Sequence, residues 1–123
     1  MAAVIAACHA GAPRGSIDDA PAEASRVVSS YAVPAPARGQ LRLKLVEVTY
    51  GPAASSKPHS HPCPVVGYVV EGVLRSRVEG EAEAAYRAGE SFYERANSVH
   101  AVSANASGSA RTKLLAVFVC EGP

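Results

Sequence analysis

Two histidines one residue apart, His59 and His61, lie in the segment KPHSHPCPV at residues 57–65. On an extended strand, the side chains of residues i and i+2 point to the same face. The two imidazole rings are therefore expected to project together and to share one metal ion through their nitrogens. Pro58 and Pro62 restrict the backbone around them, which lowers the cost of holding the rings in place. The pair predicts a metal site, although histidines beside prolines are also common in surface loops.

A third histidine, His100, lies in the later segment SVHAVSAN, where it shares a strand face with Ser98 and Val102. Of the four histidines in the chain, His59, His61 and His100 thus fall at strand positions that could meet inside a barrel. Three neutral imidazoles suit Zn, Fe, Ni or Cu and leave positions open for water or substrate. Spacing alone does not join His100 to the other two.

Cys63 is the fourth residue in this region that could bind a metal. Strand parity places it on the face of His59 and His61, where a thiolate would favour Zn or Cu, but the neighbouring prolines disturb that parity. We therefore treat Cys63 as a possible minor ligand, the alternative being a small buried apolar residue. Cys120, in an apolar run, is expected in the core. Three cysteines, odd in number and far apart, favour a reducing compartment over a disulfide framework.

The segments that must position these residues have the pattern of short β-strands. Residues 40–50, QLRLKLVEVTY, alternate at first, with Leu41, Leu43 and Leu45 on one face. The Glu-Gly turn at residues 71–72 predicts a hairpin between the strands that it joins. No convincing amphipathic helix is found. Seven to nine short strands predict an all-β fold, a small sandwich or barrel. Besides 40–50, the strands are expected at 26–33, 65–72 and 73–80, in two parts of 83–94 around Gly89, at 98–105 and at 111–120.

The N-terminal part of the chain has a different composition. Residues 9–24 mix Gly, Pro, Ala and acids without a period, so residues 1–24 are predicted to form a poorly structured tail before a barrel domain at 25–123. The start, MAAVIAAC, ends in a sequence that resembles the lipid-attachment box of bacterial lipoproteins, but it lacks a basic n-region and a longer apolar core. A cytoplasmic protein is the expectation, with an exported or lipid-anchored form as the minor alternative.

Charge and composition exclude several classes of function. The formal net charge of the 123 residues is +1, with no long block of like charge, which argues against capture of nucleic acid or of an anionic membrane surface. The chain has no Trp and few aromatic residues, so it lacks the usual platform for stacking bases. No run approaches the ~20 apolar residues that a membrane span needs. A small-molecule ligand is the expected partner.

Two motifs join the three histidines, and through them residues 40–120 resemble the cupin superfamily. HSHPCPVVGYVVEG is similar to the first cupin motif, G-x5-HxH-x3/4-E-x6-G, with Gly72 as its closing glycine. GESFYERANSVHAVSAN is similar to the second, G-x5-PxG-x2-H-x3-N. Gly89 opens it, His100 takes the histidine place, and Asn105 lies one residue late. The resemblance implies a double-stranded β-helix with a metal in the mouth of the barrel.

The departures from these motifs decide what the metal site contains. Arg95 and Asn97 replace a proline and a glycine, and Asn97 is expected to adopt the left-handed conformation that the glycine would supply. The glutamate ligand of the family should fall at position 65 or 66, and both are valine. The resemblance therefore implies a three-histidine site, His59, His61 and His100, without a carboxylate ligand. The predicted cofactor is a divalent transition metal (Fe, Zn, Ni, Mn or Cu).

The predicted substrate pocket lies beside the metal. Counting inward positions from Val65 gives Gly67 and Val69, and Tyr93 is a candidate aromatic wall. Gly67 would leave room where a side chain would otherwise lie. These four residues are the predicted substrate-binding set, although ordinary packing explains each of them singly. A small-walled apolar pocket fits a small uncharged or enolic molecule.

Two functions from different classes follow. Resemblance to three-histidine cupin oxygenases implies an iron-dependent dioxygenase-like enzyme that acts on a small organic molecule, with the metal as Lewis acid and template. The alternative is a non-catalytic cupin that binds or senses a small ligand, with a weak or absent metal. Whether the chain is an enzyme stays open at this point. A homodimer is expected, with residues 25–33 as a strand that could pair across the interface.

Overall fold

The computed structural model describes residues 26–35 and 39–122. These residues form eight strands and no helix, which confirms the predicted all-β class. None of their segments is a helix long and apolar enough to cross a membrane. The strands are β1 (Leu41–Tyr50), β2 (His59–Ser60), β3 (Val65–Glu71), β4 (Val73–Val78), β5 (Ala84–Arg87), β6 (Ser91–Glu94), β7 (Val99–Asn105) and β8 (Thr112–Glu121).

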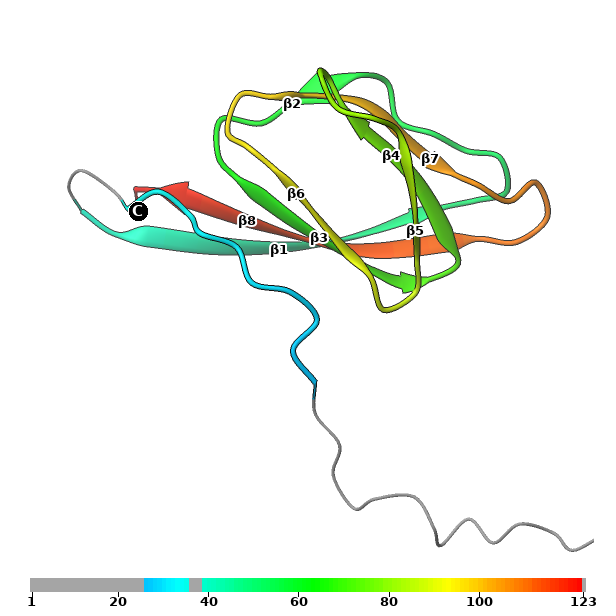
Figure 1. Cartoon of the computed structure of the whole chain (residues 1–123), viewed down its shortest axis with the longest axis horizontal. Helices are drawn as coiled ribbons and strands as arrows, with labels where there is room; N and C mark the ends of the chain where they lie inside the picture. Colours follow the sequence, from blue (N-terminus) through cyan, green and yellow to red (C-terminus); the bar gives the residue numbers. More distant parts are fainter. Residues whose placement is uncertain (1–25, 36–38, 123) are drawn as a thin grey trace, which may run out of the picture.

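The strands form two four-stranded antiparallel sheets that face each other (Figure 1). One sheet has the order β1-β8-β3-β6 and the other the order β2-β7-β4-β5. The predicted tail and domain boundary at residues 24–25 lie outside the described residues, so they stay predictions.

The longest pairing joins β1 to β8 along its full length, from Leu41 opposite Glu121 to Tyr50 opposite Thr112. The beginning of β1 and the end of β8 project together beyond the rest of the barrel (Figure 1). This projection explains why Leu41, Leu43 and Leu45 are 47%, 62% and 61% exposed, although they alternate as a buried strand face would.

The predicted hairpin between residues 65–72 and 73–80 is wrong. Both segments are strands, but β3 lies in one sheet and β4 in the other. Gly72 has φ +79° and turns the chain from the first sheet to the second. Gly89, with φ +90°, lies between β5 and β6, which also belong to different sheets. A tight turn in the sequence therefore marks a crossing between layers here, not a hairpin.

The strand predicted at residues 26–33 is also wrong. Residues 26–35 form no regular element and run beside the β5–β6 edge of the barrel. Arg26 donates a hydrogen bond to the Gly89 carbonyl, and the Tyr31 hydroxyl is hydrogen-bonded to Ser91. The Tyr31 ring stacks on Tyr93 at 5.3 Å between ring centroids. Side-chain contacts, not strand pairing, hold this segment.

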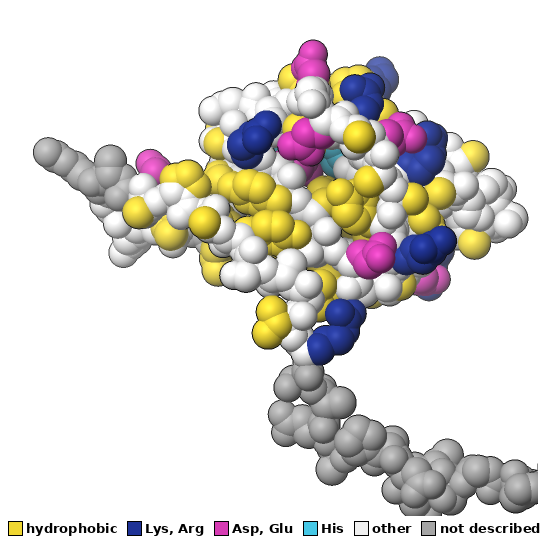
Figure 2. All heavy atoms as spheres, viewed as in Figure 1, with side chains coloured by type: hydrophobic (Ala, Val, Ile, Leu, Met, Phe, Trp, Pro, Cys, Tyr) yellow, Lys and Arg dark blue, Asp and Glu magenta, His cyan; other side chains and the backbone are white. Residues whose placement is uncertain are grey.

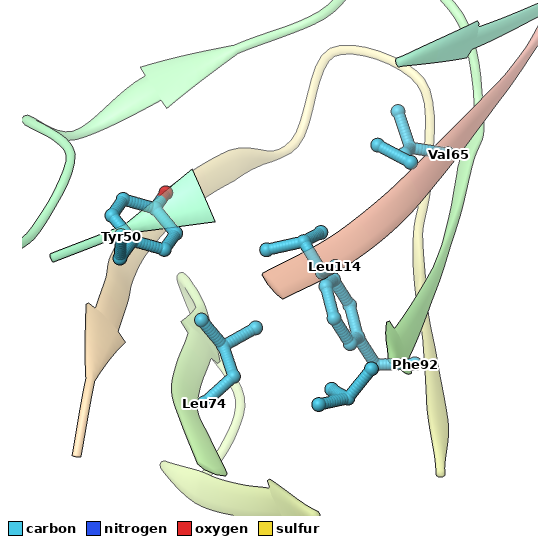
Figure 3. Close-up of a cluster of buried hydrophobic side chains, with 7 residues drawn as sticks. Tyr50, Val65, Leu74, Phe92 and Leu114 are labelled. Carbon is cyan, nitrogen blue, oxygen red and sulfur yellow. The ribbon is translucent and has the colours of Figure 1, made fainter. Parts of the chain in front are cut away.

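The core lies between the two sheets (Figure 3). The labelled side chains in Figure 3 come from both sheets and point toward one another, with Leu74 of β4 and Leu114 of β8 among them. At one end of the barrel, the buried Asn105 amide donates to the carbonyls of Gly51 and Ala110, and its oxygen accepts from the Thr112 hydroxyl. Asn105 thus holds the end of β7 against the start of β8.

Candidate metal centre

The structure brings His59, His61 and His100 together at one end of the barrel. His59 in β2 lies directly opposite His100 in β7. The ring centroids are 5.3 Å apart for His59 and His100, and 4.9 Å apart for His59 and His61. The two sequence motifs therefore meet in space, as the cupin resemblance implied.

His59 and His61 each have a ring nitrogen that could bind a metal. The His59 Nδ1 lies 2.8 Å from the Lys57 carbonyl oxygen, which only accepts, so Nδ1 carries the proton and Nε2 keeps its lone pair. The His61 ring packs edge-on against the Phe118 ring, and its nitrogens make no hydrogen bond to the described residues. Burial lowers the pKa of His61, while the Glu94 charge acts in the opposite direction. A lowered pKa keeps the ring neutral, which is the form that binds metal.

His100 is held differently, because both of its ring nitrogens have partners. Its Nε2 is hydrogen-bonded to the Ser76 hydroxyl at 2.7 Å, and its Nδ1 lies 3.1 Å from Oε1 of Glu94. All three side chains are buried. His100 can bind a metal only if it gives up one of these partners.

Glu94 is the site residue that sequence reasoning missed. It lies in β6 directly opposite Val65, so its side chain faces the same interior space as position 65. Glu94 is 5% exposed, in a strand whose inward residues are Phe92 and Glu94. The alternation in SFYE contained this signal, because it places Glu94 on the same face as the apolar Phe92.

The donors of the cluster fit a divalent transition metal by type. Imidazole suits Zn, Cu, Fe and Ni, and a carboxylate oxygen adds affinity for harder ions such as Mn. No group of three or more His, Cys, Asp or Glu side chains within residues 26–35 and 39–122 is already gathered around one point. The engagement of His100 with Ser76 and Glu94 is consistent with this. A metal would therefore require local adjustment of the side chains.

A cavity of about 100 Å³ adjoins the cluster. His59, Glu94 and His100 line it. Three residues with hydroxyl groups also line it, Tyr50, Ser56 and Ser103. The Tyr50 hydroxyl is 2.6 Å from Ser56 Oγ and 2.9 Å from Ser103 Oγ. Since one water occupies about 30 Å³ of liquid volume, the cavity has room for an ion with a few waters or a very small molecule.

The residues predicted to bind substrate do not line this cavity. Val65 and Val69 are in the hydrophobic core, 2% and 0% exposed. The space above Gly67 is not open, because the Phe92 ring fills it. Tyr93 points away from the interior and stacks on Tyr31.

Cys63 is bonded to Cys120 in a disulfide, contrary to the expectation of reduced cysteines. Its sulfur is therefore not a thiolate, so we leave Cys63 out of the proposed ligand set. The bond joins the segment before β3 to the end of β8, two strands that pair with each other. The pairing of β3 with β8 brings Cys63 and Cys120 together, which the number of cysteines did not indicate.

A larger cavity of about 360 Å³ lies next to this disulfide. Leu41, Pro62 and Val119 contribute to its mostly apolar wall. No histidine of the described residues borders it. The smaller cavity is the better candidate for chemistry of the two, because histidine, carboxylate and hydroxyl groups converge in it.

With this geometry in view, the comparisons with known proteins decide the family. The family model described as "Cupin domain" matches residues 46–118, more than half of the chain. The chain belongs to the cupin family. The match covers both histidine motifs and all of the strands except the first residues of β1 and the last of β8.

Solved structures with the same fold support this assignment. An RmlC-like cupin from Shewanella frigidimarina is 26% identical, with a TM-score of 0.54, over 63% of this chain and 65% of that one. KdgF from Halomonas sp. is 25% identical, with a TM-score of 0.56, over 65% and 70%. An oxalate oxidase in complex with the substrate analogue glycolate is 22% identical, with a TM-score of 0.59, over 66% and 43%. No curated protein matches the sequence.

Proposed function

We propose that this cupin binds a divalent transition metal at the cluster of His59, His61 and His100, and acts there on a small organic molecule. The observation that carries the proposal is the convergence of the three rings beside a small cavity that His59, Glu94 and His100 line. The His59–Lys57 contact supports it further, because a second partner on Nδ1 orients the ring and leaves Nε2 for the metal.

Iron-dependent, dioxygenase-like chemistry is the proposed reaction class. Its support is the set of nitrogen donors beside a cavity with space for a ligand. When bound, the metal would supply Lewis acidity and open coordination positions. The Tyr50, Ser56 and Ser103 hydroxyls are placed to orient a polar group of the substrate. The cavity volume of about 100 Å³ limits the substrate to a few non-hydrogen atoms unless the walls move.

A non-catalytic cupin that binds or senses a small ligand is the second candidate. The specific observation in its favour is that both His100 nitrogens already have partners, which weakens any metal site built on that ring. Oxygen consumption by the iron-loaded protein with candidate substrates would separate the two. A metal-free protein that still binds a small molecule would support the second function.

The experiment that tests metal binding is elemental analysis of the full chain as purified, before and after dialysis against a chelator, followed by reloading. We expect close to one metal per chain and a clear loss in His59→Ala and His61→Ala. His100→Ala is the third arm, since the motif match assigns it a place in the cluster. His9→Ala is the matched control, because His9 belongs to neither motif. Wild-type protein that cannot be loaded with any of Fe, Mn, Ni, Cu or Zn would overturn the proposal.

We also propose that the protein is a homodimer that associates through β1. β1 is the edge strand of its sheet, and Leu43 and Leu45 are more than half exposed on it. Figure 2 shows hydrophobic side chains along the projecting ribbon and over the adjoining sheet. A second copy that pairs antiparallel with β1 would satisfy its unpaired backbone groups and cover these leucines.

The cytoplasmic location predicted from the cysteines stays a prediction. The Cys63–Cys120 disulfide counts against it, because such bonds persist mainly in oxidising compartments. The exported form, first treated as the minor alternative, is the location that the disulfide supports.

A further inference from the structure

The metal site proposed above contains no carboxylate, and the structure holds one within reach. We propose that Glu94 is a metal ligand of this protein and that it replaces, from the opposite strand, the glutamate that the first motif lacks at position 65. This inference rests on the proposed metal binding and revises the ligand set of the same site, with Glu94 as a ligand and His100 as the residue that positions it.

The register of the two strands carries the first part of the argument. Val65 in β3 and Glu94 in β6 are direct cross-strand partners. Side chains of such partners project to the same face of the sheet, with Cβ atoms about 4.5–5.5 Å apart. A carboxylate at position 94 therefore reaches the interior region that a carboxylate at position 65 would reach. The carboxylate ligand is therefore supplied by β6 and not by β3.

The surroundings of Glu94 carry the second part. Its side chain is almost completely buried, and its single polar contact among the described residues is Oε1 with His100 Nδ1. A buried carboxylate normally needs several hydrogen bonds or a cation, because removal from water is costly. The carboxylate also lines the cavity together with His59 and His100. An ion between these side chains would add a cation to the single contact that the carboxylate makes with His100.

The role of His100 follows from the same contacts. With Nε2 bonded to Ser76 and Nδ1 next to Oε1, His100 fixes one oxygen of Glu94 and leaves Oε2 for an ion. The first ligands would then be His59, His61 and Glu94, with His100 as a positioning residue. Two imidazoles and one carboxylate form a donor set typical of non-haem iron oxygenases. Because the carboxylate is negatively charged, this set should bind Mn and Fe more tightly than a set of three neutral imidazoles would.

The test is the affinity of the full chain for Mn(II), measured by electron paramagnetic resonance of the free ion and by calorimetry, with Zn(II) in parallel. Glu94→Gln keeps the size of the side chain and removes its charge. We expect Mn(II) affinity to fall by more than about tenfold, since even outer partners of a ligand change metal affinity by about 10–100-fold. The loss should be smaller for Zn(II), because Zn(II) depends less on oxygen donors. Glu83→Gln, which removes an exposed acid, is the matched control.

Glu94→Asp keeps the charge on a shorter side chain and should lie between wild type and Glu94→Gln. That order supports the proposal, and if Glu94→Gln folds poorly, a lower Mn(II) affinity of Glu94→Asp than of wild type supports it. Equal Mn(II) affinity of wild type and folded Glu94→Gln overturns the inference while leaving metal binding by the histidines intact. An equal loss in the Glu83→Gln control also overturns it, because net charge would then explain the effect. A wild-type protein that binds neither ion overturns both the inference and the proposed function.

Discussion

At the scale of single residues, Gly67 shows how a motif position can have a structural role. The sequence suggested an open space above this glycine, whereas the Phe92 ring occupies that space from the adjacent strand β6. We predict that Gly67→Ala lowers the free energy of unfolding by about 1–3 kcal/mol, the usual cost of overpacking a core. Denaturant unfolding of the full chain would measure it. Gly108→Ala is the matched control, since nothing lies within 4 Å of the added methyl group. Equal stability of Gly67→Ala and Gly108→Ala would contradict the packing explanation.

The histidines were predictable at this scale and the carboxylate was not. HxH parity and the second motif located His59, His61 and His100, and the structure places all three in one cluster. Glu94 was missed because the motif assigns the acid to position 65. The alternation in SFYE places Glu94 on the face of Phe92, but the pairing of β3 with β6 is what places it opposite Val65. Pairing between strands is a tertiary property, which periodicity within one segment cannot reveal.

At the scale of elements, the strands were predicted well and their partners were not. Alternation identified β1, β3, β7 and β8 close to their bounds. The turn at Gly72 suggested a hairpin, because a Glu-Gly pair serves equally well to close a hairpin or to cross between sheets. Asn97 does adopt the left-handed conformation expected of it, with φ +60°. The conformation of single turn residues could therefore be predicted from the sequence. The sheet to which each strand belongs could not, because it depends on how the whole core packs.

The exposed edge of β1 gives the prediction at this scale. Replacing Leu43 and Leu45 with Lys places two charges on the proposed β1 interface. We expect the double variant to be monomeric under conditions in which wild type is a dimer, as measured by sedimentation or light scattering. Val70→Lys, at another exposed apolar residue in β3, is the control and should remain a dimer. A monomeric wild type, or a double variant that is still dimeric, would show that β1 is not the interface.

At the scale of the whole molecule, the disulfide connects the site region to β8, one of the two longest strands. Cys63 lies two residues after His61, and Cys120 lies near the end of β8, two residues after Phe118, whose ring contacts His61 at 4.8 Å. The bond therefore fixes both backbones that support the His61 ring. The cysteine count predicted reduced cysteines instead, because three widely spaced cysteines do not indicate which two meet in the fold.

The disulfide also predicts how the molecule responds to reduction. It links residues 57 positions apart, for which the chain-entropy model gives about 4 kcal/mol of stabilisation. We expect the variant with Cys63→Ser and Cys120→Ser to lose several kcal/mol of stability, and its melting temperature to fall by more than about 10 °C. Alkylation of the unfolded, unreduced wild type should modify one cysteine of the three, and reduction should expose all three.

Cys8→Ser is the control for these measurements, because Cys8 lies outside the described residues and is not part of the bond. It should keep the wild-type melting temperature. Metal content separates a structural from a ligating role for Cys63. If the disulfide only supports the loop, the double serine variant should still bind metal, with at most a modest loss of affinity as the His61 loop gains freedom. Complete loss of metal from a folded double variant would return Cys63 to the ligand set, and three alkylated cysteines before reduction would show that the bond is not formed.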